Sequence, residues 1–133
     1  MEVSGADMCF ACGKDNPISL KLDFSLVDET TARTKFTPEK VHQGYNEIMH
    51  GGLVSTLLDE AMAKVLELNE IIAVTGEMKI RFKQPVDIEQ DLTITGKINK
   101  SYRNLYYTEA RLEGEKGELL AEAEAKFMEV KSK

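Results

Sequence analysis

Residues 50 to 62 read His-Gly-Gly-Leu-Val-Ser-Thr-Leu-Leu-Asp-Glu-Ala-Met, which predicts a glycine hinge opening into a helix. At about 100° of rotation per residue, the apolar side chains from here to about Leu68 fill one broad arc of the helix surface. A helix this apolar is mostly buried. Asp59 falls at the edge of the arc, whereas Glu60 falls on the more solvated side. Asp59 is therefore predicted to be partly desolvated, which marks it as a functional candidate.

The Gly51-Gly52 pair lets the backbone approach a ligand without an intervening Cβ atom. The free N–H groups of the first helical turn then point at that ligand, and the helix dipole favours negative charge there. These are the components of an oxyanion hole. We therefore predict that Gly51 and Gly52 hold a polarised carbonyl and that Asp59 supplies a base or a nucleophile.

The rest of the chain alternates apolar and polar residues with a period of two, which is typical of half-buried strands. In the strand after the helix, this alternation places Val74, Gly76 and Met78 on one face and Thr75 on the other. Residues 1–19 are expected to be irregular. The predicted strands cover residues 20–26, 32–36, 74–82, 92–98, 106–112 and 119–127.

The predicted order of elements is β-β-α-β-β-β-β within a single domain spanning residues 1–133. Nothing but the sheet is available to bury the one apolar helix. The fold class is therefore α+β, with an antiparallel β-sheet wrapped around one central α-helix. The loop over residues 38–50 is long for a compact domain, and loops of this length tend to be functional.

The net charge of −6 argues against a general nucleic-acid binder, which needs a basic surface. The sequence contains no run of about 18 apolar residues, so no membrane span is expected. The first seven residues are acidic and lack the apolar core of a signal peptide, so a cytoplasmic location is expected. No cofactor is expected.

Cys9 and Cys12 form a single C-x-x-C pair. Structural zinc sites usually have four ligands, and only His42 and His50 could complete such a site, at a spacing that fits no common finger. The turn-forming residues after Cys12 are unlike a redox motif, which opens a helix. We expect no metal and two reduced structural thiols.

Three segments resemble the hotdog-fold acyl-CoA thioesterases of the phenylacetyl-CoA and hydroxybenzoyl-CoA thioesterase superfamily. They are Cys9 to Pro17, the core motif from His42 to Met62, and Thr75 to Val86. The resemblance extends from about residue 9 to residue 130. It implies the hotdog fold, hydrolysis of acyl-CoA to free acid and CoA, and a homodimer that is often paired into a tetramer.

The resemblance also implies roles for individual residues. Asp59 matches the catalytic acid, as general base or nucleophile, and Gly51 matches the residue whose N–H polarises the thioester carbonyl. His50 matches an orienting residue, and Thr75 a hydroxyl that helps to hold water. Some relatives have an asparagine where Gly44 stands. Candidate substrate-binding residues are His42, which more readily braces the loop, Asn46, Gly52 and the cations Lys79, Arg81 and Arg103, which suit CoA phosphates.

Two other functions remain open at this point. A non-catalytic module that binds acyl-CoA or acyl-carrier protein would keep the fold without needing Asp59. A hotdog hydratase or dehydratase would pair an acid with a histidine. A shared active site is also expected, because Gly51 and Asp59 lie about 12 Å apart along one helix, so that two chains packed antiparallel would bring the groups together.

Overall fold

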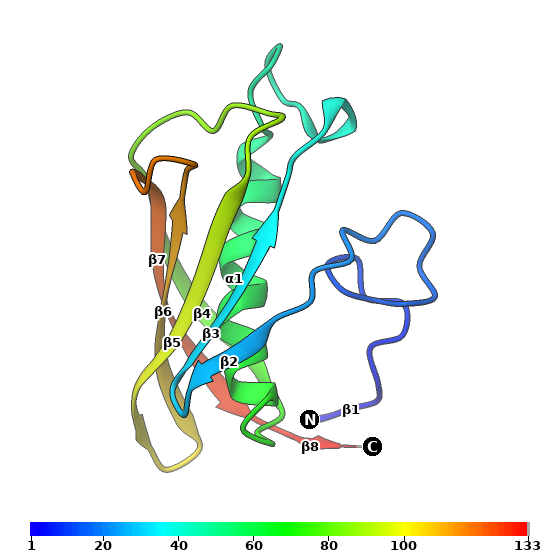
Figure 1. Ribbon diagram of the computed structural model, residues 1–133. Coiled ribbons are helices and arrows are strands. Elements are labelled where there is room, and N and C mark those ends of the chain that lie inside the picture. Colours follow the sequence, from blue (N-terminus) through cyan, green and yellow to red (C-terminus); the bar gives the residue numbers. More distant parts are fainter. Residues whose placement is uncertain (133) are drawn as a thin grey trace.

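A single helix lies along a curved antiparallel sheet in the computed structural model, which describes residues 1–132 (Figure 1). The helix α1 covers Gly51–Glu67, close to the predicted range, and the short 3-10 helix η1 covers Lys40–His42. Within residues 1–132, no helix is long and apolar enough to cross a membrane. The strands are β1 (Glu2–Val3), β2 (Ser25–Asp28), β3 (Thr31–Phe36), β4 (Ala73–Phe82), β5 (Leu92–Tyr102), β6 (Leu105–Glu113), β7 (Leu119–Glu129) and β8 (Lys131–Ser132).

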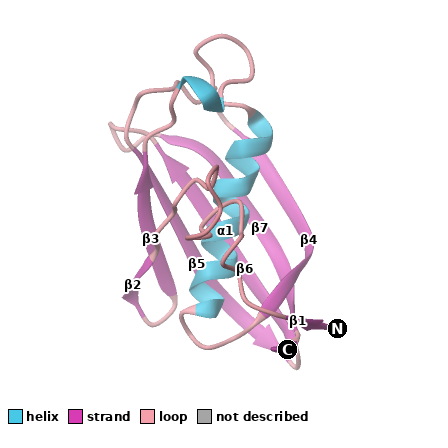
Figure 2. Cartoon of the chain, turned by 90° about the vertical axis from the view of Figure 1, so that its right-hand side faces the viewer, coloured by secondary structure: helices cyan, strands magenta, loops and turns pink. Residues whose placement is uncertain are grey.

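The main sheet has six strands in the order β2-β3-β5-β6-β7-β4, and every neighbouring pair is antiparallel. Strand β4 follows the helix in sequence but lies at the far edge, next to β7. The two edge strands, β2 and β4, therefore lie on opposite sides of α1 (Figure 2). The predicted architecture, an antiparallel sheet wrapped around one central helix, is confirmed.

A row of small residues lets the helix approach the sheet closely. Ala32, Gly96, Ala110 and Ala123 are direct neighbours across β3, β5, β6 and β7. A Cβ atom at Gly96 would lie only 2.2 Å from the carbonyl oxygen of Ala61 in α1. The backbones of helix and sheet thus meet at this row, which fixes the depth at which α1 lies in the curve of the sheet.

The N-terminal segment crosses the side of α1 that the sheet leaves uncovered (Figure 2). It is less irregular than predicted, because β1 pairs in parallel with β8. The predicted strand over residues 20–26 pairs in the sheet only from Ser25 onward. Before that point, the N–H groups of Leu20 and Leu22 donate to Phe10 and Ala11 of the N-terminal segment instead.

A β-bulge in β4 places Thr75 on the face of the strand opposite to the predicted one. The register with β7 shifts between Thr75 and Glu77, so Thr75 is opposite buried Phe127 while Met78 is opposite buried Ala125. Both Thr75 and Met78 consequently face the helix. Strict alternation predicted opposite faces for them, and the extra residue in the bulge is the reason for the error.

Candidate active site

The first turn of α1 is organised by His50 and the two glycines. His50 is the N-cap residue, and its Nδ1 atom accepts a hydrogen bond from the Gly52 N–H at 2.8 Å. A Cβ atom on Gly52 would lie 3.0 Å from the His50 ring, so glycine provides the space for this cap. Among residues 1–132, no group accepts a hydrogen bond from the Gly51 N–H. Gly51 therefore presents a free donor at the positive end of the helix dipole.

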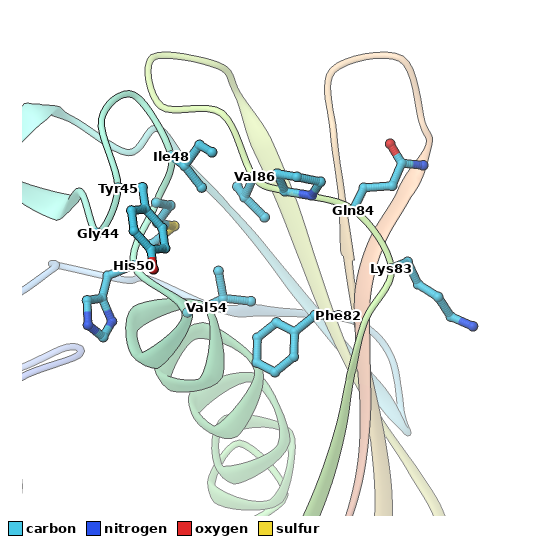
Figure 3. Close-up of a pocket in the computed structure, with 12 residues that line it drawn as sticks. Gly44, Tyr45, Ile48, His50, Val54, Phe82, Lys83, Gln84 and Val86 are labelled. Atoms are coloured by element: carbon cyan, nitrogen blue, oxygen red, sulfur yellow. The ribbon is translucent and has the colours of Figure 1, made fainter.

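A cavity of about 690 Å³ opens beside this donor (Figure 3). Gly51 and His50 form part of its wall, and most of the remaining wall is apolar. Tyr45 and Phe82 in this wall are 87% and 56% exposed, which is unusual for large aromatic side chains. The residues contributed by the loop before the helix, by α1 and by the end of β4 are Gly44, Tyr45, Ile48, Met49, His50, Gly51, Val54, Phe82, Lys83, Gln84, Pro85 and Val86.

The loop that forms one wall of this cavity is tied to both flanks. The Met49 N–H donates to the Val86 carbonyl at 2.7 Å, and the His50 N–H donates to the His42 carbonyl at 2.9 Å. His42 also accepts a hydrogen bond from the Glu39 N–H at its Nδ1 atom, at 2.8 Å. His42 thus ties the loop through its carbonyl and its ring, and its role in substrate binding stays a prediction. These bonds hold the cavity wall in position against the start of α1.

Asp59 and Thr75 form the second element of the site. The Thr75 hydroxyl donates to Asp59 Oδ1 at 2.8 Å, joining the middle of α1 to the start of β4. Asp59 is half-buried, as predicted from its place at the edge of the apolar arc. The hydrogen bond fixes one carboxylate oxygen and leaves Oδ2 available. The structure thus brings together two of the four residues predicted to be catalytic.

Gly51 and Asp59 do not meet within one chain. Both belong to α1, with Gly51 at its first position, so a rise of about 1.5 Å per residue separates them by about 12 Å along the axis. The His50 ring is held against the N-terminal turn by its bond to Gly52. The two parts of the predicted site are therefore at different heights on the same helix.

The predicted substrate-binding cations lie elsewhere. Lys79 and Arg81 are opposite Glu124 and Glu122 of β7, on the face of the sheet turned away from α1. Arg103 lies in the turn between β5 and β6, at the opposite end of the sheet from the start of α1 (Figure 1). Within one chain, none of the three is near both Gly51 and Asp59. Asn46 is exposed in the loop before α1, where it is close in sequence to the cavity residue Tyr45.

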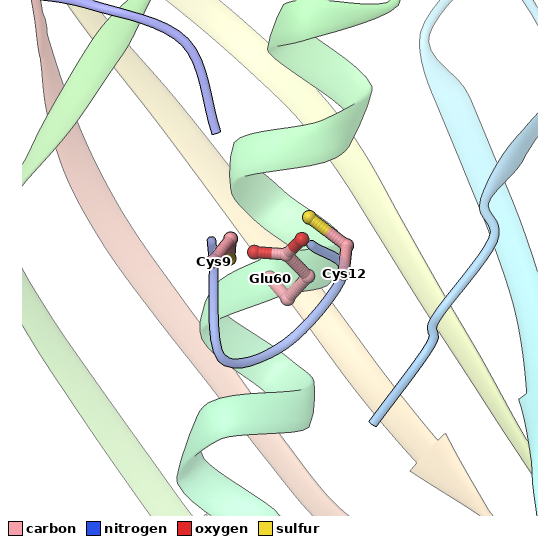
Figure 4. Close-up of side chains that lie close together, drawn as sticks. All are labelled: Cys9, Cys12 and Glu60. Atoms are coloured by element: carbon pink, nitrogen blue, oxygen red, sulfur yellow. The ribbon is translucent and has the colours of Figure 1, made fainter. Parts of the chain in front are cut away.

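Glu60 is not on a solvated face, and this prediction is wrong. The N-terminal segment covers the side chain and brings Cys9 and Cys12 to it (Figure 4). Burial raises the pKa of Glu60, although the Cys12 thiol and the Lys64 charge oppose that shift. Burial, reinforced by the Glu60 carboxylate, raises the pKa of Cys12 to about 12. The two thiols and the carboxylate form a cluster that the sequence did not predict.

Two parts of the site were missed from the sequence. The aromatic residues Tyr45 and Phe82 were not singled out, although exposure of such large apolar residues marks them once the fold is known. The angular position of Glu60 on the helix predicts exposure, and the sequence suggests only His42 and His50 as possible partners for Cys9 and Cys12. Nothing in the local sequence signals that a distant segment crosses that side of the helix.

Similar structures support the fold over most of the chain. A thioesterase superfamily protein of known crystal structure superimposes with a TM-score of 0.85 at 21% identity, covering 92% of this chain and 60% of that protein. This chain thus spans 60% of that protein's length. A hypothetical thioesterase from Streptococcus pneumoniae TIGR4, solved with coenzyme A, gives a TM-score of 0.78 at 16% identity. The match covers 83% of this chain and 89% of that protein. The E. coli PaaI protein, from the phenylacetic acid degradation operon, gives a TM-score of 0.77 at 21% identity. The match covers 82% of this chain and 83% of that protein.

Sequence comparison identifies the family. Curated protein sequences gave no significant match. The model that describes the thioesterase superfamily matches residues 46–121, which include all of α1 and reach into β7. The matched range contains Gly51, Asp59 and Thr75, and it covers more than half of the chain. With the six-stranded antiparallel sheet around one helix, this match shows that the chain belongs to the thioesterase superfamily.

Proposed function

We propose that this protein hydrolyses acyl-CoA thioesters to free acid and CoA. The observation that carries the proposal is the pairing of Asp59 with the Thr75 hydroxyl on a helix whose first N–H group, that of Gly51, is free beside an apolar cavity. Thioester hydrolysis needs a group that activates water and a donor that stabilises the oxyanion. Asp59 and Gly51 have these two chemistries. A solved relative that contains coenzyme A supports a CoA ester as the substrate.

In the proposed reaction, the Gly51 N–H donates to the thioester carbonyl oxygen. Asp59 accepts a proton from water as the water oxygen attacks the carbonyl carbon. The oxyanion of the tetrahedral intermediate is stabilised by the same N–H and by the helix dipole. The carbon–sulfur bond then breaks, and the proton held by Asp59 is returned to the departing CoA thiolate. The apolar wall containing Tyr45 and Phe82 accommodates the uncharged part of the substrate.

The proposed site is shared between two chains. A base must act within hydrogen-bond reach or through one water, whereas Gly51 and Asp59 of one chain are about 12 Å apart along α1. Two copies of α1 packed antiparallel across a two-fold axis bring Gly51 of one copy to Asp59 of the other, twice. This arrangement makes a homodimer the smallest active unit.

Substitution of Asp59 tests the chemistry. Asp59→Asn keeps the size of the side chain and removes the base, so kcat/KM on an acyl-CoA should fall by about 10² or more. Asp23→Asn is the matched control, because Asp23 is exposed and outside the site. Normal turnover by a folded Asp59→Asn variant would refute the assignment.

Complementation tests the shared site. Gly51→Pro removes the N–H group, and proline is tolerated at the first position of a helix. His50 already has the extended ψ of 131° that a residue before proline favours. We expect a loss of about 10²–10³ in kcat. Gly51→Ala is the control that keeps the N–H, since its Cβ atom meets nothing nearer than Phe82 at 3.8 Å.

Mixing the Asp59→Asn and Gly51→Pro proteins should restore activity, because a mixed dimer contains one intact site. If subunit exchange is verified and no activity returns, the shared-site arrangement is wrong. The products separate the other two functions: a hydratase adds water to an enoyl chain without releasing CoA, and a binding module retains the acyl-CoA intact.

A further inference from the structure

The cluster of Cys9, Cys12 and Glu60 lies outside the proposed active site and has the composition of a metal site. One ligand atom from each residue lies within 4.8 Å of the other two (Figure 4). The thiols come from the N-terminal segment and the carboxylate from the middle of α1. All three residues are half-buried, so the cluster is sheltered yet remains reachable from solvent.

The loop that carries the two thiols is held in shape by its own backbone. The Gly13 N–H donates to the Cys9 carbonyl at 2.8 Å, and the Cys9 N–H donates to the Ala6 carbonyl at 3.0 Å. A Cβ atom on Gly13 would lie 2.4 Å from the Cys9 nitrogen, so only glycine fits this tight turn. Lys21 ties the turn down, because its Nζ atom donates to the Gly13 carbonyl at 3.1 Å. The backbone of this loop therefore holds its shape without a bound ion.

Glu60 supplies an independent observation. Its Oε2 atom is buried and has no hydrogen-bond partner among the described residues. A buried polar atom without a partner is costly, and native structures seldom leave one unexplained. The neighbouring acid is different, since Asp59 accepts a hydrogen bond from Thr75. The unpartnered Glu60 oxygen belongs to the same cluster as the two thiols.

We propose that Cys9, Cys12 and Glu60 bind one thiophilic divalent cation, with water as the fourth ligand. The preferred ion is Zn²⁺. Zinc accepts cysteine sulfur at about 2.3 Å and carboxylate oxygen at about 2.0–2.2 Å in tetrahedral geometry. Two sulfur ligands at that distance are about 3.8 Å apart. The three ligand atoms lie within 4.8 Å of one another, so rotations of their side chains between staggered positions are what is needed to reach tetrahedral geometry.

The charges and the ligand types both favour zinc. Thiolate ligands select zinc or copper(I) over magnesium and calcium, which prefer oxygen. The two thiols lose their protons to solvent on binding, so two thiolates, one carboxylate and Zn²⁺ carry a net charge of −1. Lys64 forms an ion pair with Glu67 at 3.0 Å and also interacts electrostatically with Cys12 and Glu60, so it offsets part of this charge.

The metal would fasten the N-terminal segment to α1 at the residue after Asp59. Its role is structural, because Glu60 is directed to the thiols whereas Asp59 is directed to Thr75. The sequence predicts no metal at these thiols, since a two-cysteine motif alone has too few ligands. Only the crossing of the helix by the N-terminal segment provides the third.

Metal binding by the full chain tests the proposal without any measurement of activity. The reduced protein is stripped with a chelator and titrated with Co²⁺ and, separately, with Zn²⁺. We expect one equivalent per chain, a thiolate-to-cobalt charge-transfer absorption that Zn²⁺ abolishes, and a higher Tm for the zinc-loaded protein. Cys9→Ser and Cys12→Ser should each lose the charge-transfer band.

Glu60→Gln identifies the third ligand. It should weaken zinc binding by about tenfold or more, the effect expected even from loss of an outer-shell contact. Glu29→Gln is the charge-matched control, because Glu29 is exposed in the turn between β2 and β3 and should bind zinc normally. Failure of the reduced wild-type protein to bind one equivalent of either ion would overturn the proposal, as would a full charge-transfer band in Cys12→Ser. Unchanged zinc affinity in Glu60→Gln would also overturn it, and this variant keeps both thiols in place.

Discussion

Replacement of Thr75 with valine should weaken catalysis by about tenfold. The Thr75 hydroxyl donates to Asp59 Oδ1 at 2.8 Å, and a hydrogen bond to a charged group contributes about 1.5–3 kcal/mol. Thr75 is exposed and Asp59 only half-buried, so water competes and the lower end of that range applies. A loss of about 1.4 kcal/mol corresponds to a factor of about ten in rate.

The effect should appear in kcat, with KM nearly unchanged, because Thr75 positions the acid and does not contact the substrate in the proposed reaction. The assay follows release of free CoA from an acyl-CoA with a thiol reagent. Valine has the shape of threonine and suits a strand, so the fold should be retained. Thr75→Ser is the control that keeps the hydroxyl, and its rate should stay close to that of the wild type.

A double-mutant cycle sharpens the test. If Thr75 acts only through Asp59, then adding Thr75→Val to Asp59→Asn should cause little further loss. An unchanged rate in the folded Thr75→Val protein would refute the positioning role. A full tenfold additional loss in the double variant would also refute it, because Thr75 would then act independently of Asp59.

Two predictions concern the elements that position the site. His50→Ala removes the cap on the Gly52 N–H and should lower the free energy of unfolding by about 1 kcal/mol, measured by urea denaturation; an unchanged midpoint would show that the cap contributes nothing. Gly96→Ala places a Cβ atom 2.2 Å from the Ala61 carbonyl oxygen and should destabilise the protein by about 3 kcal/mol or more, measured in the same way. Gly5→Ala is its control, since a Cβ atom at Gly5 meets nothing within 4 Å, and equal stability of the two variants would contradict the close contact of helix and sheet.

The alternation of residues 20–26 predicted burial correctly for most of its apolar residues, and it predicted pairing incorrectly. Leu20, Leu22 and Phe24 are buried, as a period of two requires, whereas Leu26 is 41% exposed. Only Ser25 onward joins the sheet, because the backbone before it bonds to the N-terminal segment and Lys21 adopts a left-handed φ of 57°. Periodicity reports which side chains are covered. It does not report which backbone satisfies the hydrogen bonds.

The face of Thr75 shows the same limit of periodicity at the proposed active site. The resemblance to thioesterases predicted a role for its hydroxyl, while the alternation of its own strand placed it on the wrong face. The bulge between Thr75 and Glu77 reverses the alternation before Met78 and brings the hydroxyl to Asp59. A one-residue register shift depends on how β4 and β7 pair, which is a property of two distant segments.

Local sequence patterns were enough to predict the helix from Gly51, its apolar arc, the antiparallel strands around it and the half-buried position of Asp59. These features follow from local periodicity and from the backbone freedom of glycine, so they are encoded by neighbouring residues. Those patterns did not predict that β4 pairs with β7, that Thr75 meets Asp59, or that Glu60 lies against Cys9 and Cys12. Each of these depends on contacts between segments far apart in the chain, where packing and hydrogen bonding outweigh local pattern.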